Sequence, residues 1–87
     1  MGLVFDEHAF EDLAWWMSTD VKKARKVIAL IQEVRRTPFV GRGKPEPLKH
    51  ELTGCWSRRI DERHRLVYEP RGNDIRILSC RFHYDDK

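Results

Sequence analysis

A change of hydrophobic periodicity partway along the 87-residue chain is the feature that most constrains its fold. Apolar side chains repeat at helical spacing through residues 10–17 and again through residues 21–34, whereas residues 55–60, 65–69 and 75–82 are short strand-like runs. A helix buries one stripe and a strand buries one face, so the helices are expected to cover the sheet. The sequence therefore predicts an α+β fold with two N-terminal helices packed on a small, mainly antiparallel sheet.

Polar residues mark the expected ends of the helices. Asp6 and Asp20 stand where a side chain can cap the first and the second helix. Pro38 stops the second helix at about residue 36, because the residue before a proline avoids the helical conformation. A short strand candidate at residues 3–5 precedes the first helix.

The segment from residue 39 to residue 54 is rich in glycine and proline. It is expected to be a long loop that Pro45 and Pro47 partly stiffen, and long loops in small domains usually carry function or are disordered. Turn-forming residues at 61–64 and 70–74 separate the three late strands. These strands are therefore expected to form an antiparallel meander.

Length and apolar pattern bound the class of protein. Eighty-seven residues predict a single domain, residues 1–87. The longest apolar run, Val27 to Ile31, is much shorter than a membrane span, and the first residues lack a secretory signal pattern. A cytoplasmic protein with no membrane partner is expected. Cys55 and Cys80 have no CxxC spacing, so we expect two buried, reduced thiols.

Positive charge is concentrated in the middle of the chain. Residues 35–71 hold ten Lys and Arg against five Asp and Glu, and the whole chain carries a formal charge of +3. A basic face attracts polyanions such as RNA, whereas an ordinary solvated surface is the alternative explanation. The glutamate and histidine residues that accompany this segment favour the RNA interpretation.

Three side chains suit metal-free cleavage of RNA by its own 2′-hydroxyl. Glu46 can take the hydroxyl proton, Arg65 can stabilise the charged phosphorane, and His83 can protonate the departing 5′ oxygen. Tyr84 can stack on a base or orient a phosphate. The histidines lack the short paired spacing of a zinc site. The sequence therefore predicts a catalytic group of these four residues with no metal and no cofactor.

Further cationic side chains are candidate contacts for RNA phosphates. Alternation along residues 55–60 directs Arg58 and Arg59 to opposite faces of the sheet, so a regular strand cannot aim both at one pocket. The candidate phosphate-binding set is Lys44, Lys49, His50, Arg58, Arg59 and Arg81.

Each catalytic candidate also has a purely structural interpretation. Glu46 can be a solvated loop carboxylate, and His83 can be an idle surface imidazole. Arg65 can pair with Glu62 or Glu69 in its own hairpin. The three tryptophans are expected in the core or an interface rather than as platforms for RNA bases.

Specific motifs extend from residue 35 almost to the end of the chain. They are RRTPF at 35–39, GKPEPLKH at 43–50, WSRRI at 56–60 and HRLVY at 64–68, followed by Cys80, Arg81, His83 and Tyr84. Together these motifs resemble the YoeB toxins of the RelE/ParE superfamily. The resemblance implies a RelE-like microbial ribonuclease fold and a type II toxin that cleaves mRNA in the ribosomal A site without a metal, and so inhibits translation.

The resemblance also implies roles for particular residues. It implies that Arg65 is the transition-state clamp, His83 the general acid and Tyr84 an ordering residue. Glu46 is implied as the general base, although the family leaves open whether a ribosomal group takes the proton instead. Lys49 and Arg59 are implied to assist with RNA.

The partners implied by the resemblance are the 70S ribosome with its mRNA, a second copy of the chain, and a YefM-type antitoxin whose acidic, disordered tail covers the active site. The chain departs from the family at its end, where Phe82 replaces a common tyrosine and Asp85, Asp86 and Lys87 follow. Two other functions stay open: a superfamily toxin that inhibits a protein such as gyrase, and a non-catalytic RNA-binding module.

Overall fold

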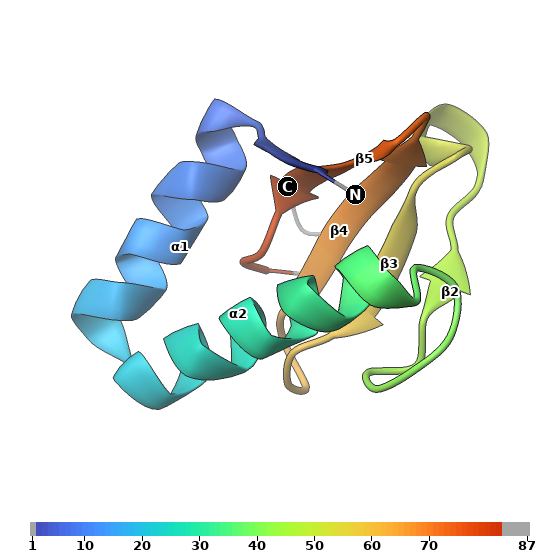
Figure 1. The fold of residues 1–87 in the computed structure, drawn as a ribbon. Helices are drawn as coiled ribbons and strands as arrows, with labels where there is room; N and C mark the ends of the chain where they lie inside the picture. The colour runs from blue at the N-terminus through green and yellow to red at the C-terminus, as the bar shows by residue number, and fades with distance from the viewer. Residues whose placement is uncertain (1, 83–87) are drawn as a thin grey trace.

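The computed structural model describes residues 2–82 and contains two helices and a five-stranded sheet. Both helices lie on the same side of the sheet (Figure 1). The sheet order is β1-β5-β4-β3-β2. In chain order the elements are β1 (Gly2–Phe5), α1 (Glu7–Thr19), α2 (Val21–Arg36), β2 (Glu46–Pro47), the 3-10 helix η1 (His50–Leu52), β3 (Trp56–Arg59), β4 (Arg65–Arg71) and β5 (Asp74–Ser79).

The sheet is mixed because its first strand runs parallel to its last. β1 pairs in parallel with β5, whereas β5, β4, β3 and β2 are antiparallel neighbours. The late strands thus form the expected meander, and the short first strand extends it at one edge. The predicted α+β architecture, with two helices on a mainly antiparallel sheet, is confirmed.

Two apolar clusters cover the two faces of the sheet. The larger one joins α1 and α2 to the sheet through residues such as Trp16, Leu30 and Ile77. The smaller one lies on the opposite face, where Leu48 packs with Cys55 and with Val67 of β4. This second cluster attaches the segment around β2 and η1 to the sheet. The expected long loop at residues 39–54 therefore contains two short ordered elements.

The two helix caps differ from each other. The Asp20 carboxylate accepts a hydrogen bond from the Lys23 N–H at 3.2 Å and caps α2 as predicted. Asp6 stands at the N-cap position of α1 without a capping hydrogen bond from its side chain. Its carboxylate binds the Arg76 guanidinium of β5 instead, at 2.8 and 3.2 Å. The predicted N-cap position of Asp6 is therefore confirmed, but its side chain does not form the capping hydrogen bond.

The last strand is shorter than predicted. It ends at Ser79, three residues before the predicted end at Phe82. The pairing of β5 with β4 has a register irregularity between Val67 and Tyr68 of β4. The main chain of Cys80 is bound by helix side chains, because its N–H donates to Asp12 Oδ2 at 3.0 Å and its carbonyl accepts from Trp16 Nε1 at 2.6 Å. These two bonds replace the ladder bonds of a longer strand. Across residues 2–82, no helix has the length and apolar character to cross a membrane.

Candidate functional site

Glu46 and Arg65 meet at the edge of the sheet. β2 places Glu46 opposite Ser57 of β3, and Arg65 begins the neighbouring strand β4. Arg65 Nη1 lies 3.2 Å from Glu46 Oε1 and 3.4 Å from Ser57 Oγ. The Arg65 side chain is 15% exposed and the Glu46 side chain 51% exposed. Solvent therefore reaches the pair, and the partner of Arg65 is Glu46 rather than Glu62 or Glu69.

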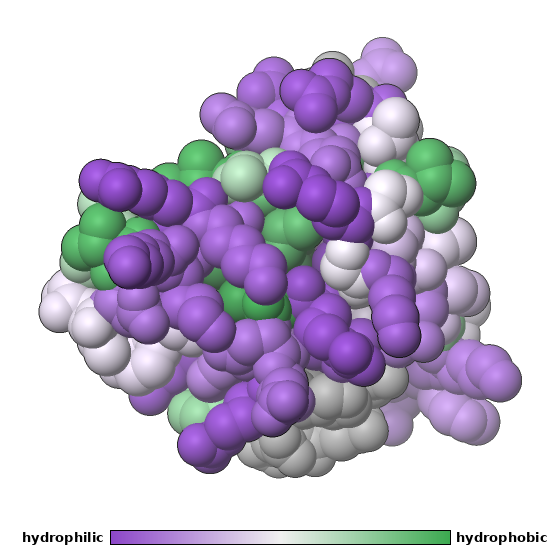
Figure 2. Space-filling model, turned by 90° about the horizontal axis from the view of Figure 1, so that it is seen from below, coloured by the Kyte–Doolittle hydropathy of each residue, from purple (hydrophilic) through white to green (hydrophobic). Residues whose placement is uncertain are grey.

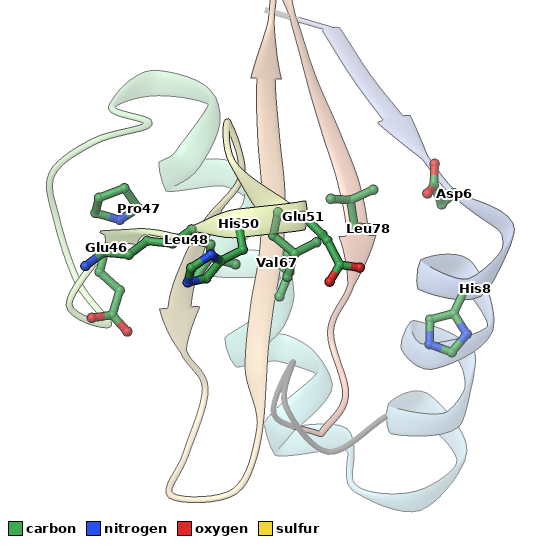
Figure 3. A pocket seen from close by; sticks show the side chains of 11 residues that line it. Asp6, His8, Glu46, Pro47, Leu48, His50, Glu51, Val67 and Leu78 are labelled. Atoms are coloured by element: carbon green, nitrogen blue, oxygen red, sulfur yellow. The ribbon is translucent and has the colours of Figure 1, made fainter.

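An open concavity of about 910 Å³ begins at Glu46 and runs across the face of the sheet toward α1. Figure 3 shows Val67 and Leu78 in its middle, whereas the Glu46 carboxylate points away from that middle. The concavity therefore has an apolar floor and a polar rim. The full lining is Asp6, His8, Glu46, Pro47, Leu48, Lys49, His50, Glu51, Leu52, Val67 and Leu78.

Arg58 holds the loop between α2 and β2. Its side chain is completely buried, and its guanidinium donates to Glu33 Oε1 at 2.6 Å and to the carbonyls of Thr37, Val40 and Arg42. A guanidinium can satisfy several carbonyls at once because its N–H groups form a planar fork. This burial corrects the expectation that Arg58 contacts phosphate, and the expected alternation explains it, since Arg58 points toward the helices.

Glu33 and Tyr68 complete this arrangement. The Tyr68 hydroxyl donates to the Pro38 carbonyl at 2.6 Å and lies 3.2 Å from Arg58 Nε. The Arg42 backbone N–H bond at 2.7 Å, together with the Arg42 and Arg58 guanidinium groups, lowers the pKa of Glu33 from 4.5 to about 2. A Cβ at Gly41 would stand only 2.2 Å from Glu33 Oε1, and the backbone φ of Gly41 is +130°. Glycine is therefore required at this position.

A second group of side chains holds the chain after β5. His64 Nδ1 accepts a hydrogen bond from the Phe82 N–H at 2.7 Å, and the Arg65 N–H donates to the Phe82 carbonyl at 3.1 Å. The Arg81 guanidinium stacks over the Trp15 ring at 3.6 Å from its centre. Arg81, a predicted phosphate contact, thus packs against α1. Residues 80–82 are held in place mainly by side chains of α1 and of the turn before β4.

The remaining predicted site residues lie in three places. Lys49 and His50 line the concavity together with Glu46. Lys44 and Arg59 line a different hollow of about 520 Å³ beside α2. His83 and Tyr84 lie outside the described residues.

Figure 2, which looks at the molecule from below the view of Figure 1, shows a face dominated by hydrophilic side chains with apolar residues between them.

The two cysteines are free and buried. Burial is the main cause that raises the pKa of Cys80 to about 12, and burial also raises the pKa of Cys55. Both thiols therefore stay protonated at neutral pH, as expected of structural cysteines. Within residues 2–82, no group of three or more His, Cys, Asp or Glu side chains is arranged to hold a metal ion.

The sequence did not predict the hydrogen-bonding roles of several supporting residues, although it did place Trp16 in the core or an interface. They are Glu33 and Tyr68 for the loop, and Asp12, Trp16 and His64 for the chain end. Their partners are distant in the chain, so local periodicity contains no signal for them. The available hint in the sequence was that strand alternation places Arg58 on the same face as Trp56 and Ile60, because a guanidinium among apolar side chains requires acceptors.

This architecture, a five-stranded sheet with two helices on one face, is shared with solved bacterial toxins. A family model for the YoeB-like toxin of bacterial type II toxin–antitoxin systems matches residues 5–84. Toxin YoeB from Escherichia coli (strain K12) is 50% identical over 84 residues, which are 97% of this chain and 100% of that protein. The chain belongs to the YoeB-like toxins of type II toxin–antitoxin systems.

Solved structures agree with this family. The YoeB/ParE toxin from Agrobacterium tumefaciens superposes with a TM-score of 0.93 at 44% identity, covering 97% of this chain and 100% of that one. YoeB from Staphylococcus aureus, solved as a dimer, superposes with a TM-score of 0.88 at 42% identity, covering 97% and 98%. The same toxin has also been solved in a heterotetrameric YoeB–YefM toxin–antitoxin complex, with a TM-score of 0.87 at 42% identity and the same coverage.

Proposed function

We propose that this toxin, acting as one domain of residues 1–87, is a ribosome-dependent endoribonuclease that cleaves mRNA in the A site and so inhibits translation. The observation that supports the proposal most directly is the 3.2 Å approach of Glu46 Oε1 to Arg65 Nη1 in a solvent-accessible position. A carboxylate and a guanidinium held together suit a reaction that moves a proton and builds negative charge on a phosphate.

The proposed reaction is a transesterification within the message. Glu46 takes the proton of a ribose 2′-hydroxyl, whose oxygen forms a bond to the neighbouring phosphorus. Arg65 stabilises the phosphorane through its planar fork of N–H groups. The bond from phosphorus to the 5′ oxygen then breaks, and His83 supplies the proton that the departing oxygen needs. The products are a 2′,3′-cyclic phosphate and a 5′-hydroxyl, with Tyr84 ordering the substrate. No step of this reaction requires a metal.

The basic residues around the pair fit contacts to RNA phosphates. Lys49 and His50 line the concavity that begins at Glu46, and the exposed Arg59 is the register partner of Arg65 across β3 and β4. Lys44 shares the second hollow with Arg59. Positive charges on this part of the molecule would increase the local concentration of a polyanion.

The proposed partners follow from the relatives. We assign this chain a YefM-type antitoxin and a homodimeric state, because the Staphylococcus aureus toxin has been solved as a dimer and as a YoeB–YefM heterotetramer. The ribosome and mRNA are the proposed substrate complex. The cationic side chains near the proposed cleavage site, such as Arg65, Lys49 and Arg59, are suitable contacts for an acidic antitoxin segment, since the same charges would attract RNA.

The direct test is a reconstituted translation complex with end-labelled message and EDTA. We expect cleavage at one A-site phosphate with a cyclic or 3′-phosphate end. Glu46→Gln and Arg65→Ala should each slow cleavage by about 10²- to 10⁴-fold, since each removes a group that acts in the transition state. His83→Ala should do the same.

Matched exposed residues provide the controls. Glu51→Gln changes a carboxylate of the same concavity, and Arg63→Ala changes an exposed arginine of the turn before β4. Both variants should cut at nearly the parental rate. Undiminished cleavage by all three site variants would remove the proposed roles. An uncut message together with loss of gyrase supercoiling would support the protein-inhibitor alternative, and salt-sensitive RNA binding without product would support the non-catalytic one.

A further inference from the structure

We propose that His64 is a positioning residue, which fixes the main chain of Phe82 and thereby sets the point from which the two proposed catalytic residues His83 and Tyr84 continue. The inference rests on the proposed function, because it gives the chain end a purpose in cleavage. His64 belongs to the turn before β4 and immediately precedes Arg65, the proposed clamp.

Both polar groups of the Phe82 main chain are bound by this one dipeptide. The Phe82 N–H donates to His64 Nδ1 at 2.7 Å, and the Phe82 carbonyl accepts from the Arg65 N–H at 3.1 Å. Phe82 also has a left-handed backbone conformation with a φ of +61°. A residue other than glycine keeps this conformation only where its surroundings hold it. The His64–Arg65 dipeptide supplies that restraint at the last described residue of the chain.

The hydrogen bond defines the chemical state of the His64 ring. An imidazole nitrogen that accepts an N–H bond carries no proton, so Nδ1 is bare and the proton of the neutral ring is on Nε2. The ring is buried, and its centre lies 4.8 Å from the Trp16 ring and 5.4 Å from the Phe82 ring. Aromatic packing against these two rings helps to keep the imidazole in the orientation that the hydrogen bond requires.

The surroundings of His64 favour this neutral form. Burial is the largest cause that lowers the pKa of His64 below 6.5, and the charges of Arg63, Arg81 and Lys23 lower it further. The negative charge of Asp61, whose carboxylate accepts a hydrogen bond from the backbone N–H of His64 at 2.8 Å, acts in the opposite direction and raises the pKa. The acceptor at Nδ1 is therefore preserved at neutral pH. Cleavage by the parent should weaken in mildly acidic solution as His64 takes up a proton.

His64 bears on the proposed catalysis because the same dipeptide carries the Arg65 guanidinium and holds the chain end. The Arg65 guanidinium contacts Glu46, while its own N–H and the adjacent imidazole hold Phe82. A single turn thus holds both the start of the Arg65 strand and the main chain of Phe82. Displacement of a catalytic group by about 1 Å can reduce a rate by about 100-fold, so loosening this support should lower the rate of the chemical step.

Two substitutions at residue 64 separate its hydrogen bond from its packing. His64→Phe keeps an aromatic ring and removes the acceptor, whereas His64→Asn places an amide oxygen near the position of Nδ1. With saturating toxin on the A-site complex, His64→Phe should slow single-turnover cleavage by about 10- to 100-fold. His64→Asn should retain most of the parental rate. The toxin concentration that gives half-maximal rate should be unchanged in both variants.

A second pair of variants tests whether His64 acts through His83. In a His83→Ala background, His64→Phe should cause little further loss, because the group that it positions is already missing. A parental rate for His64→Phe, equal losses for His64→Phe and His64→Asn, or a full additional loss in the His83→Ala background would each overturn the proposal. A parent that does not cut would instead contradict the proposed function.

Nitrogen NMR of the parent toxin tests the proposal without any variant. The His64 ring should show an unprotonated Nδ1 with a scalar coupling to the Phe82 amide proton at neutral pH. This measurement keeps the proposal testable if His64→Phe does not fold. A protonated Nδ1, or the absence of the coupling, would overturn it even in a fully active toxin.

Discussion

The loop between α2 and β2 and the short chain end after β5 are both irregular, yet they are held by opposite kinds of groups. The loop is arranged around Arg58, a buried guanidinium that stays charged at any ordinary pH. The chain end is bound by the Asp12 carboxylate, the Trp16 indole N–H and the neutral His64 ring. The charge at the centre of the first support is therefore constant near neutral pH, whereas part of the second support depends on the protonation state of a histidine.

The two supports hold different parts of the proposed site. The loop leads into β2 and so carries Glu46, which in the proposed mechanism acts beside Arg65. The chain end leads into the proposed acid. A support made of single hydrogen bonds to residues 80–82 is easier to open than one charged group with several acceptors. The following experiments test whether the two supports differ in strength and in pH dependence.

Removal of the guanidinium should have the largest effect. Arg58→Met keeps a long apolar side chain but leaves Glu33 and the loop carbonyls without their buried partner. Breaking a buried charge pair by removing one partner usually costs about 3–5 kcal/mol. Urea unfolding monitored by circular dichroism should show a loss of this size in the free energy of unfolding.

The neighbouring arginine provides the control for this measurement. Arg59→Met makes the same chemical change at an exposed position of the same strand, where the expected change is within about 0.5 kcal/mol. Equal losses in the two variants would show that Arg58 has no special place in the loop. The loop between α2 and β2 would then have no stronger support than the chain end.

A smaller effect is expected at the chain end. Trp16→Phe removes the indole N–H that binds the Cys80 carbonyl and leaves this buried acceptor unsatisfied, which costs about 1–3 kcal/mol in addition to the lost ring volume. Amide hydrogen exchange should show faster exchange at residues 80–82, with little change at Arg42 in the loop. Trp56→Phe, at a half-buried indole that packs on Phe39, is the matched control and should leave residues 80–82 protected.

Local patterns in the sequence predicted the fold well. The helical spacing of α1 and α2, the cap at Asp20 and the meander of β3, β4 and β5 all depend on residues close together in the chain. The same patterns directed Arg58 and Arg59 to opposite faces, which the structure bears out with one arginine buried and the other exposed. Periodicity therefore predicts elements and faces.

Periodicity does not predict which distant side chain binds a particular main-chain group. The end of β5 depends on Asp12 and Trp16, which precede Cys80 by 68 and 64 residues. The Asp6 carboxylate binds Arg76, 70 residues later, although its local setting is that of a helix cap. In the candidate site, the meeting of Glu46 and Arg65 was expected from chemistry, but the burial of Arg58 and the support by His64 required the three-dimensional packing.

The smallest expected difference between the two supports is in how local opening of each segment depends on pH. In a locally opened state, a side chain binds a proton at its ordinary pKa. A group whose pKa is lower in the folded protein therefore stabilises the closed state fully at pH values above its ordinary pKa. This stabilisation is lost as the pH falls through the folded pKa. For His64 the loss begins below pH 6.5, and for Glu33 it is confined to the range from 4.5 to about 2. Hydrogen exchange, corrected for intrinsic rates, should therefore show protection of the Phe82 amide falling by up to about tenfold per pH unit below 6.5. The Arg42 amide, which binds Glu33, should keep its protection until about pH 4.5. Earlier loss at Arg42 than at Phe82 would reverse the proposed order of the two supports.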